Sequence, residues 1–556
     1  MPTHLSATAT AAALLALLVL AAAAPADVPV AITIDAAHPI GPLKPVWRFF
    51  GYDEANYTYM PDGRTLVGEL GRLGTPGAPV YVRCHDLLSS GDGVPSLKWS
   101  STNAYTEDAA GKPVYDWTIT DRIFDTYAAA GAKPYVEIGF TPEAMTVHPQ
   151  NYPHDPPPEV PLSPKMGQAW PPKDFGRWGE LVHQWVLHEV QRYGADTVRS
   201  WYWEVWNEPN IEYWQGTRAQ YFQLYDVTVA AVRAALPGAR VGGPEAAGGA
   251  GGTFLRAFLQ HCQDAHVPID FVSFHAKGRP KFVDGHVRMG LGYQLTDVDR
   301  AAAVIASFPA FKHLPIVIGE SDPEGCAACR GPQNGYRNGT MYSSYEAASL
   351  PRILDLADAH GVNLEGNLTW AFEFEHEPYF SGFRALATNG VDLPVLNVFR
   401  LWSQMHGQRL PVTSTADHTA ADIRATGVPV DHPDVSAYAA VDGDHLYLMA
   451  WHYADDDLPG PAADVTLSVA GLPWTDGPAK TTVQRIDAGH ANSYAAWQRM
   501  GSPQPPTAQQ KAELVTASAL SPEPLKAVDV ARGVATVRLT VPRQGVALVT
   551  LSAPVP

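Results

Sequence analysis

An alternation of short apolar segments and helical stretches, repeated from Phe49 to Gly407, constrains the fold of this chain most. In one helical stretch, Trp178, Val182 and Trp185 follow the 3.6-residue period of a helix. Strands that are apolar on both faces and alternate with helices indicate a parallel sheet. The eight predicted strands are 49–54, 80–88, 133–140, 200–210, 240–246, 270–278, 315–320 and 364–372.

Eight such units predict an α/β fold in which the sheet closes into a (β/α)₈ TIM barrel over residues 45–407. The alternative is an open, doubly wound parallel sheet. That fold usually carries a glycine-rich phosphate loop after its first strand, and the sequence GYDEANYTYM at 51–60 is not such a loop.

From Gln408 onward the pattern changes to that of an antiparallel sheet. Asp442-Gly443 lies between two apolar runs and predicts a hairpin. Segments 463–471, 481–487, 534–541 and 545–552 alternate with a period of two, and no long helix is evident. We therefore predict an accessory antiparallel β-sandwich over 408–556, joined by an N-terminal strand in 27–44.

The N-terminus, residues 1–26, reads as a signal peptide. Its apolar run from Ala11 to Ala24 is short for a transmembrane helix, and small residues follow for cleavage. This predicts an exported protein, periplasmic or secreted, that has no membrane association after cleavage. The formal net charge of −18 argues against nucleic acid as a partner, because nucleic acid requires a basic face.

The four cysteines of the chain allow limited covalent chemistry. In an exported protein, Cys326 and Cys329 can close a small disulfide loop, although the sequence leaves open whether they do. Cys84 lies within a predicted strand, which indicates a buried thiol. A zinc site needs more ligands than this cysteine pair supplies, so we expect no metal and no cofactor.

Polar residues gather where the predicted strands end. In a barrel of this kind the active site forms at the carboxyl ends of the strands. Carboxylates, histidines and aromatic rings together are typical of a cleft that binds a carbohydrate. The residues at these positions are Asp53, Glu54, His85, Asp86, Glu137, Asn207, Glu208, Glu245, His275, Lys277, Glu320 and Trp370.

Two of these carboxylates, Glu208 and Glu320, end the fourth and seventh predicted strands. Paired carboxylates suit glycoside hydrolysis, because one protonates the leaving oxygen while the other meets the cationic anomeric carbon. When the two lie about 5–5.5 Å apart, the second acts as a nucleophile. The less specific alternatives are a capping or salt-bridge role for Glu208, and nearby Asp322 or Glu324 in place of Glu320.

The segment Trp206-Asn207-Glu208-Pro209, with DFVSFHAKG at 270–278 and PIVIGESDPEG at 315–325, resembles glycoside hydrolase family 39. That family holds β-xylosidases and α-L-iduronidases with catalytic glutamates on strands four and seven. The resemblance covers roughly residues 45–410. It implies a retaining mechanism in which Glu208 is the general acid/base and Glu320 is the nucleophile. Asn207 would bind the 2-hydroxyl of the sugar, and His85 and His275 would bind other hydroxyls. Trp370 would form an aromatic floor.

Different motifs of the sequence favour different sugars as the substrate. GESDPEG and Lys277-Gly278 are closer to the iduronidase pattern, whereas TNGVDLPVLNVF at 388–399 is similar to the xylosidase layout. We expect an exo-acting β-xylosidase that releases xylose from xylo-oligosaccharides. The alternatives are a uronide hydrolase of the α-L-iduronidase type, an arabinosidase, or a non-catalytic sugar-binding protein. Lys277 could meet a uronate carboxylate, a neutral sugar's hydroxyl, or a neighbouring acid such as Glu320 or Glu245, and we favour the last two.

Overall fold

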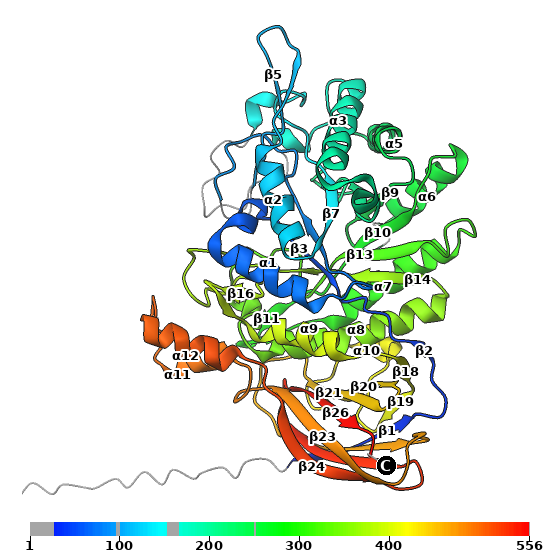
Figure 1. Ribbon diagram of the computed structural model, residues 1–556, viewed down its shortest axis with the longest axis vertical. Helices are drawn as coiled ribbons and strands as arrows, with labels where there is room; N and C mark the ends of the chain where they lie inside the picture. Colours follow the sequence, from blue (N-terminus) through cyan, green and yellow to red (C-terminus); the bar gives the residue numbers. More distant parts are fainter. Residues whose placement is uncertain (1–26, 96–99, 153–165, 250–251, 555–556) are drawn as a thin grey trace, which may run out of the picture.

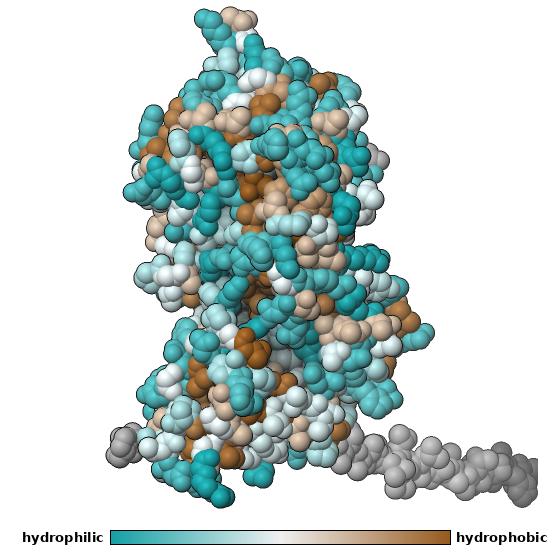
Figure 2. Space-filling model, turned by 90° about the vertical axis from the view of Figure 1, so that its right-hand side faces the viewer, coloured by the Kyte–Doolittle hydropathy of each residue, from teal (hydrophilic) through white to brown (hydrophobic). Residues whose placement is uncertain are grey.

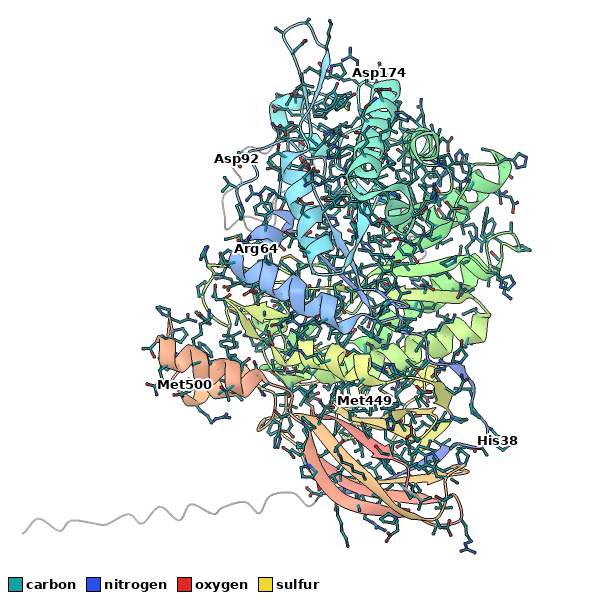
Figure 3. The ribbon with its side chains drawn as sticks, viewed as in Figure 1. His38, Arg64, Asp92, Asp174, Met449 and Met500 are labelled. Atoms are coloured by element: carbon teal, nitrogen blue, oxygen red, sulfur yellow. A yellow bond between two sulfur atoms is a disulfide. The ribbon has the colours of Figure 1, made fainter. Side chains whose placement is uncertain are left out.

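The computed structural model describes residues 27–95, 100–152, 166–249 and 252–554. The expected signal peptide, residues 1–26, lies outside them. A barrel forms the upper part of the molecule and a β-sandwich the lower part (Figure 1). Figure 3 marks the two ends: Asp174 lies near the top of the barrel, whereas His38 and Met449 lie in the lower part.

A ring of parallel strands forms the barrel, as the sequence predicts. The eighth strand is divided at Leu368, and its first half pairs with the seventh strand while its second half pairs with the first, which closes the ring. The strands, in sheet order, are β3 (Phe49–Tyr52), β4 (Tyr81–Cys84), β7 (Lys133–Ile138), β8 (Tyr202–Val205), β9 (Arg240–Ala246), β10 (Phe271–Lys277), β13 (Pro315–Asp322), β14 (Asn363–Asn367) and β15 (Thr369–Trp370).

One helix or more follows each barrel strand and covers the outside of the ring. Side chains from both layers form one continuous core. Local signals begin several of these helices; Asp174, for example, accepts hydrogen bonds from the first amides of α3. The helices are α1 (Pro61–Leu73), α2 (Thr118–Ala129), α3 (Phe175–Tyr193), α4 (Ala195–Arg199), α5 (Arg218–Ala235), α6 (Phe254–Asp264), α7 (Leu291–Ala306), α8 (Thr340–His360) and α9 (Pro394–Gln404).

The fourth strand is shorter than the sequence predicts. The apolar run suggested a strand over 200–210, but β8 ends at Val205. Trp206 has φ 74° and Glu208 has φ 44°, and these left-handed values are incompatible with an extended strand. Asn207 and Glu208 therefore lie just beyond the strand, on a sharp turn over the mouth of the barrel.

The sandwich consists of two sheets. The first contains β1 (Val28–Asp35), which runs parallel to β22 (Ala463–Ala470) and antiparallel to β19 (Val412–Ser414); β25 (Ala535–Val541) completes it. Val30, Ile32 and Ile34 alternate into the core between the sheets. The second sheet contains β2 (Gly41–Pro42), β18 (Gln408–Leu410), β20 (Asp434–Asp442), β21 (His445–Tyr453), β26 (Val546–Ser552), β23 (Gly477–Ile486) and β24 (Glu523–Val530).

Three helices of 7, 7 and 11 residues interrupt the described part of this region, which the sequence predicts as strands alone. They are α10 (Ala420–Thr426), α11 (Ser493–Arg499) and α12 (Ala508–Ser518). Only two residues of α12, Leu514 and Ser518, are buried, so its sequence carries little apolar periodicity. A capping box between Thr507 and Gln510 begins it instead. Figure 1 shows α11 and α12 projecting from the side of the molecule, next to Met500 in Figure 3.

Short antiparallel strand pairs lie in the loops. They are β5 (Tyr105–Glu107) with β6 (Pro113–Tyr115), β11 (Lys281–Val283) with β12 (His286–Arg288), and β16 (Ala387–Thr388) with β17 (Val391–Asp392). Cys326 and Cys329 form a disulfide, a pairing that the sequence left open. Cys84 is a buried free thiol, as its place in a predicted strand indicated. No helix in the described ranges is long and apolar enough to cross a bilayer. On the face in Figure 2, hydrophobic residues are interspersed with hydrophilic ones.

Candidate active site

The carboxyl ends of the barrel strands meet around one fully buried arginine, Arg83 on β4. Its guanidinium nitrogens lie 2.9 Å from Glu137 on β7, 2.6 Å from Glu204 on β8, 3.5 Å from Glu245 on β9 and 3.7 Å from Glu320 on β13. One cation thus faces carboxylates from four different strands. This arrangement packs a high density of buried charge under the mouth of the barrel.

Arg83 was not among the residues expected in the site, because it lies inside the predicted strand 80–88 rather than at its end. A signal was present. Arg83 is a charged residue inside an otherwise apolar strand, and it precedes His85 by two positions, so the two side chains lie on the same face.

Glu208 reaches this site from the turn after β8. Its backbone amide donates a hydrogen bond to the carbonyl of Glu245, 3.1 Å away, which fixes the turn against β9. Its carboxylate Oε1 lies 2.8 Å from Nδ1 of His275, at the end of β10. The Glu208 side chain is 14% exposed, so it is open to a ligand while its neighbour His275 is fully buried.

Glu320 faces the same site because of an irregularity between β10 and β13. The pairing register shifts between Phe274 and His275, which places His275 opposite Glu320 and Lys277 opposite Asp322. If the pairing continued without the shift, Gly319 would lie opposite His275 and the Glu320 side chain would point to the other side of the sheet. A one-residue shift reverses the face of every side chain in a strand.

Positive groups surround the Glu320 carboxylate. Nζ of Lys277 lies 2.7 Å away, Nε2 of His85 3.6 Å and Nδ1 of His275 3.7 Å. Burial alone would raise the pKa of Glu320, but the charges of His275 and Lys277 outweigh it and lower the pKa well below its usual value. Glu320 is therefore ionised at neutral pH, as a nucleophile must be.

Nδ1 of His275 lies between the two candidate catalytic carboxylates. It is 2.8 Å from Oε1 of Glu208 and 3.7 Å from Oε1 of Glu320. The sum of these distances, 6.5 Å, is the upper limit of the separation between the two oxygens. The carboxylates that were 112 positions apart in the sequence thus share one site.

Lys277 pairs with two acids. Its ammonium lies 2.7 Å from Glu320 and 2.8 Å from Asp322. Asp322 also accepts the backbone N–H of Trp370 at 2.9 Å and lies 3.6 Å from the buried guanidinium of Arg384. Of the three partners considered for Lys277, the structure shows a neighbouring acid, and it adds Asp322 to the pair.

The remaining predicted residues also line this site. Asn207 is buried, and its Oδ1 accepts a hydrogen bond from Arg83 at 3.2 Å. His85 bonds through Nδ1 to Glu137, and its Nε2 lies 3.3 Å from Asp53. Their contacts with a sugar stay predictions.

The Trp370 ring closes one side of the site. The guanidinium of Arg83 lies 5.0 Å from its ring centroid, and the His85 ring lies 4.4 Å away, centroid to centroid. A Cβ on Gly51 of β3 would overlap this ring, so the first strand accommodates Trp370 only by having no side chain there. The aromatic floor that the sequence suggested thus lies against the charged cluster, at the junction of the first and eighth strands.

In the described part of the chain, one group of side chains has potential metal-ligand atoms within 4.8 Å of one another: Asp121, His188 and Glu189. These residues belong to α2 and α3 on the outside of the barrel, and none of them is a candidate catalytic residue.

Comparisons with known proteins agree with this geometry. The family model for glycosyl hydrolases family 39 matches residues 30–532. A β-xylosidase of Geobacillus stearothermophilus is 27% identical over 442 residues, which are 77% of this chain and 78% of the relative. The human α-L-iduronidase is 26% identical over 393 residues, 63% of this chain and 56% of the relative.

Among solved structures, a monomeric β-xylosidase from Caulobacter crescentus CB15 superposes with a TM-score of 0.73 at 26% identity, covering 94% of this chain and all of that one. A bacterial orthologue of human α-L-iduronidase, at 21% identity, shares the fold with a TM-score of 0.68. The family match spans both the barrel and most of the sandwich. The chain therefore belongs to glycosyl hydrolases family 39 and is a glycosidase.

Proposed function

We propose that this glycosidase is a retaining, exo-acting β-xylosidase that releases xylose from xylo-oligosaccharides. The observation that carries the proposal is the pairing of Lys277 with Glu320 and Asp322. An ammonium that already holds two carboxylates suits a neutral sugar better than a uronate, whose own carboxylate would need a free cation. Similarity to β-xylosidases of two bacteria supports the same choice.

The separation of the two glutamates supports a retaining mechanism. Inverting glycosidases hold their carboxyl groups about 6.5–9.5 Å apart to admit a water molecule, and retaining ones about 5–5.5 Å apart. The limit of 6.5 Å between the oxygens of Glu208 and Glu320 favours the retaining range. Glu320 would attack the anomeric carbon while Glu208 donates a proton to the leaving oxygen. Glu208 would then take a proton from water as that water releases the sugar from Glu320.

A uronide hydrolase is the second candidate. Lys277 and the buried Arg384 lie on either side of Asp322, and this group of charges could rearrange to bind a carboxylate on the sugar. The α-L-iduronidases among the relatives favour it.

A panel of aryl glycosides of xylose, arabinose, iduronic acid and glucuronic acid decides between these candidates. We expect the highest kcat/KM on the β-xyloside. A higher value on either uronide would overturn the proposed substrate and leave the assignment as a glycosidase intact.

We also propose that the protein is exported. The apolar N-terminal run supports this, and so does the Cys326–Cys329 disulfide, because disulfides persist in oxidising compartments. Expression with its own N-terminus in a Gram-negative host, followed by fractionation and N-terminal sequencing, tests it: a mature chain that begins near Asp27 outside the cytoplasm is expected.

A further inference from the structure

Glu245, at the end of β9, is a buried carboxylate that the proposed mechanism does not use. It is fully buried. The register between β9 and β10 shifts at this point: Ser273 pairs with Pro244 and Phe274 pairs with Ala246, so Glu245 is the extra residue of a β-bulge. Its φ of 51° confirms the irregular backbone. Bulges beside active sites redirect a side chain, and this one directs Glu245 toward the centre of the barrel.

The Glu245 carboxylate faces two cations. Oε1 lies 3.5 Å from Nε of Arg83, and Oε2 lies 3.5 Å from Nε2 of His275. Among the described residues, neither oxygen of Glu245 completes a hydrogen bond, and neither does Nε2 of His275, although all three atoms are buried. The Glu245 carboxylate and the His275 ring, each with buried polar atoms that complete no hydrogen bond, thus face each other. Burying a charge is costly unless an opposite charge accompanies it.

The structure also makes room for this carboxylate next to the candidate nucleophile. A Cβ on Gly319, the residue before Glu320, would overlap the carboxyl group of Glu245. The seventh strand therefore approaches Glu245 with bare backbone. Glu245 lies behind His275, which in turn contacts Glu208 and Glu320.

From this geometry we infer that Glu245 is a positioning residue that keeps His275 doubly protonated, so that Nδ1 of His275 always offers a proton to Glu208 and a positive charge to Glu320. The inference rests on the proposed catalytic roles of those two glutamates. Glu245 itself touches neither the sugar nor the reacting atoms.

The charges of the surrounding groups agree. Burial lowers the pKa of His275, but Glu320, Glu245 and Glu208 raise it to about 10. Burial raises the pKa of Glu245, and the charges of His275 and Arg83 reverse that effect and lower it. The charged groups that contact this pair are Arg83 on β4, Glu208 after β8 and Glu320 on β13. Glu137 on β7 and Glu204 on β8 contact the same Arg83, and the hydroxyls of Tyr135 on β7 and Tyr221 on α5 also interact electrostatically with Glu245.

Glu204 takes up part of the charge of Arg83. Its Oε2 accepts a hydrogen bond from Nε of Arg83 at 2.6 Å, and its Oε1 accepts one from the hydroxyl of Tyr135 at 2.6 Å. Burial raises the pKa of Glu204 well above the usual value, against the charge of Arg83. His275 has Glu245 behind it and the carboxyl groups of Glu208 and Glu320 in front.

The substitution Glu245→Gln removes the charge at constant shape, so His275 should become neutral in the working pH range. An imidazolium stabilises the ionised form of Glu320, and its loss raises the pKa of that carboxyl. The acid limb of kcat/KM reports ionisation of the nucleophile. This limb should therefore move to higher pH by about one unit or more.

The experiment records kcat/KM against pH on the best aryl glycoside for wild type, Glu245→Gln and a matched control, Glu189→Gln. Glu189 is another fully buried carboxyl group, on α3, where it accepts a hydrogen bond from Trp185. The control should keep the acid limb in place. An acid limb of Glu245→Gln that coincides with that of wild type would overturn the inference, because a merely structural role predicts that result.

A second measurement is made on the wild-type protein and needs a variant only to identify the resonances. In wild-type protein labelled with ¹⁵N-histidine, both ring nitrogens of His275 should carry protons at pH 8. The resonances are identified by their absence in His275→Gln. A neutral ring at pH 8 would contradict the inference.

The failure of this inference is distinguishable from the failure of the proposed function. If a fluorosugar labelled a residue other than Glu320, the proposed nucleophile would be wrong, while the measured charge state of His275 would still stand.

Discussion

The ammonium nitrogen of Lys277 lies 2.7 Å from the carboxylate of Glu320, and this contact joins the ends of β10 and β13. It contributes to the low pKa of Glu320. Asp322 holds the same ammonium at 2.8 Å, so two carboxylates share its charge. Two proposals depend on this arrangement: Glu320 as the nucleophile and a neutral sugar as the substrate.

Replacing Lys277 with Met should lower activity on xylosides and leave uronides poor substrates. Removing one member of a buried charge pair costs about 2–5 kcal/mol. The acid limb of kcat/KM should also move to higher pH, because the lysine no longer favours the ionised form of Glu320. Steady-state kinetics on both substrate classes checks this. Lys526→Met, on the exposed surface of β24, is the control and should behave as wild type. A uronide preference in wild type that disappears in Lys277→Met would establish a uronidase instead.

Replacing Glu208 with Ala should slow the hydrolysis of xylo-oligosaccharides far more than that of aryl xylosides with good leaving groups. A good leaving group needs little protonation, and general acid catalysis is typically worth about 10²–10⁴-fold. The ratio of kcat/KM on the two substrate types measures the effect. Glu212→Ala, in the same loop but exposed, should leave that ratio unchanged. Equal losses on both substrates for Glu208→Ala would refute the acid assignment.

The strand pattern of the barrel could be predicted because each strand is a short apolar run bounded by polar residues. The end of the fourth strand could not, because apolarity continues through Trp206 while its φ of 74° ends the strand. The helix α12 was not predicted because its residues show little apolar spacing, and the capping box at Thr507 is what marks its start.

The motifs placed the candidate catalytic pair in one site, whereas they did not predict its electrostatic partners. The sequence left open a uronate, a sugar hydroxyl or a neighbouring acid as the partner of Lys277, and the register shift between Phe274 and His275 brings it against Glu320 and Asp322. The shift falls at Gly319, and a glycine inside a strand often marks a bulge, so this residue was the available signal. Arg83 was overlooked because it lies inside the predicted strand 80–88, five residues before its end.

A mechanism-based fluorosugar should label Glu320, because Glu320 is ionised and its side chain, although mostly buried, keeps 7% of its surface exposed. Peptide mass analysis after proteolysis locates the label. The nearby Glu324 already has partners: it accepts a hydrogen bond from the Tyr336 hydroxyl at 2.8 Å and pairs with Arg337 at 2.8 Å. A label on Asp322 or Glu324, or a first product of inverted anomeric configuration, would contradict the nucleophile assignment.

Gly51→Ala should damage both stability and catalysis. The new Cβ would overlap the ring of Trp370, which lies between the first strand and the charged residues Arg83 and His85. Overpacking a tight core costs about 1–3 kcal/mol, so the melting temperature should fall. Because the displaced ring contacts His85, kcat/KM should fall as well. Gly77→Ala is the matched control, since no heavy atom lies within 4 Å of the Cβ it would add. Calorimetry and kinetics on the two variants test this; a Gly51→Ala protein with the stability and activity of Gly77→Ala would show that the Trp370 ring is not held as tightly as its contacts indicate.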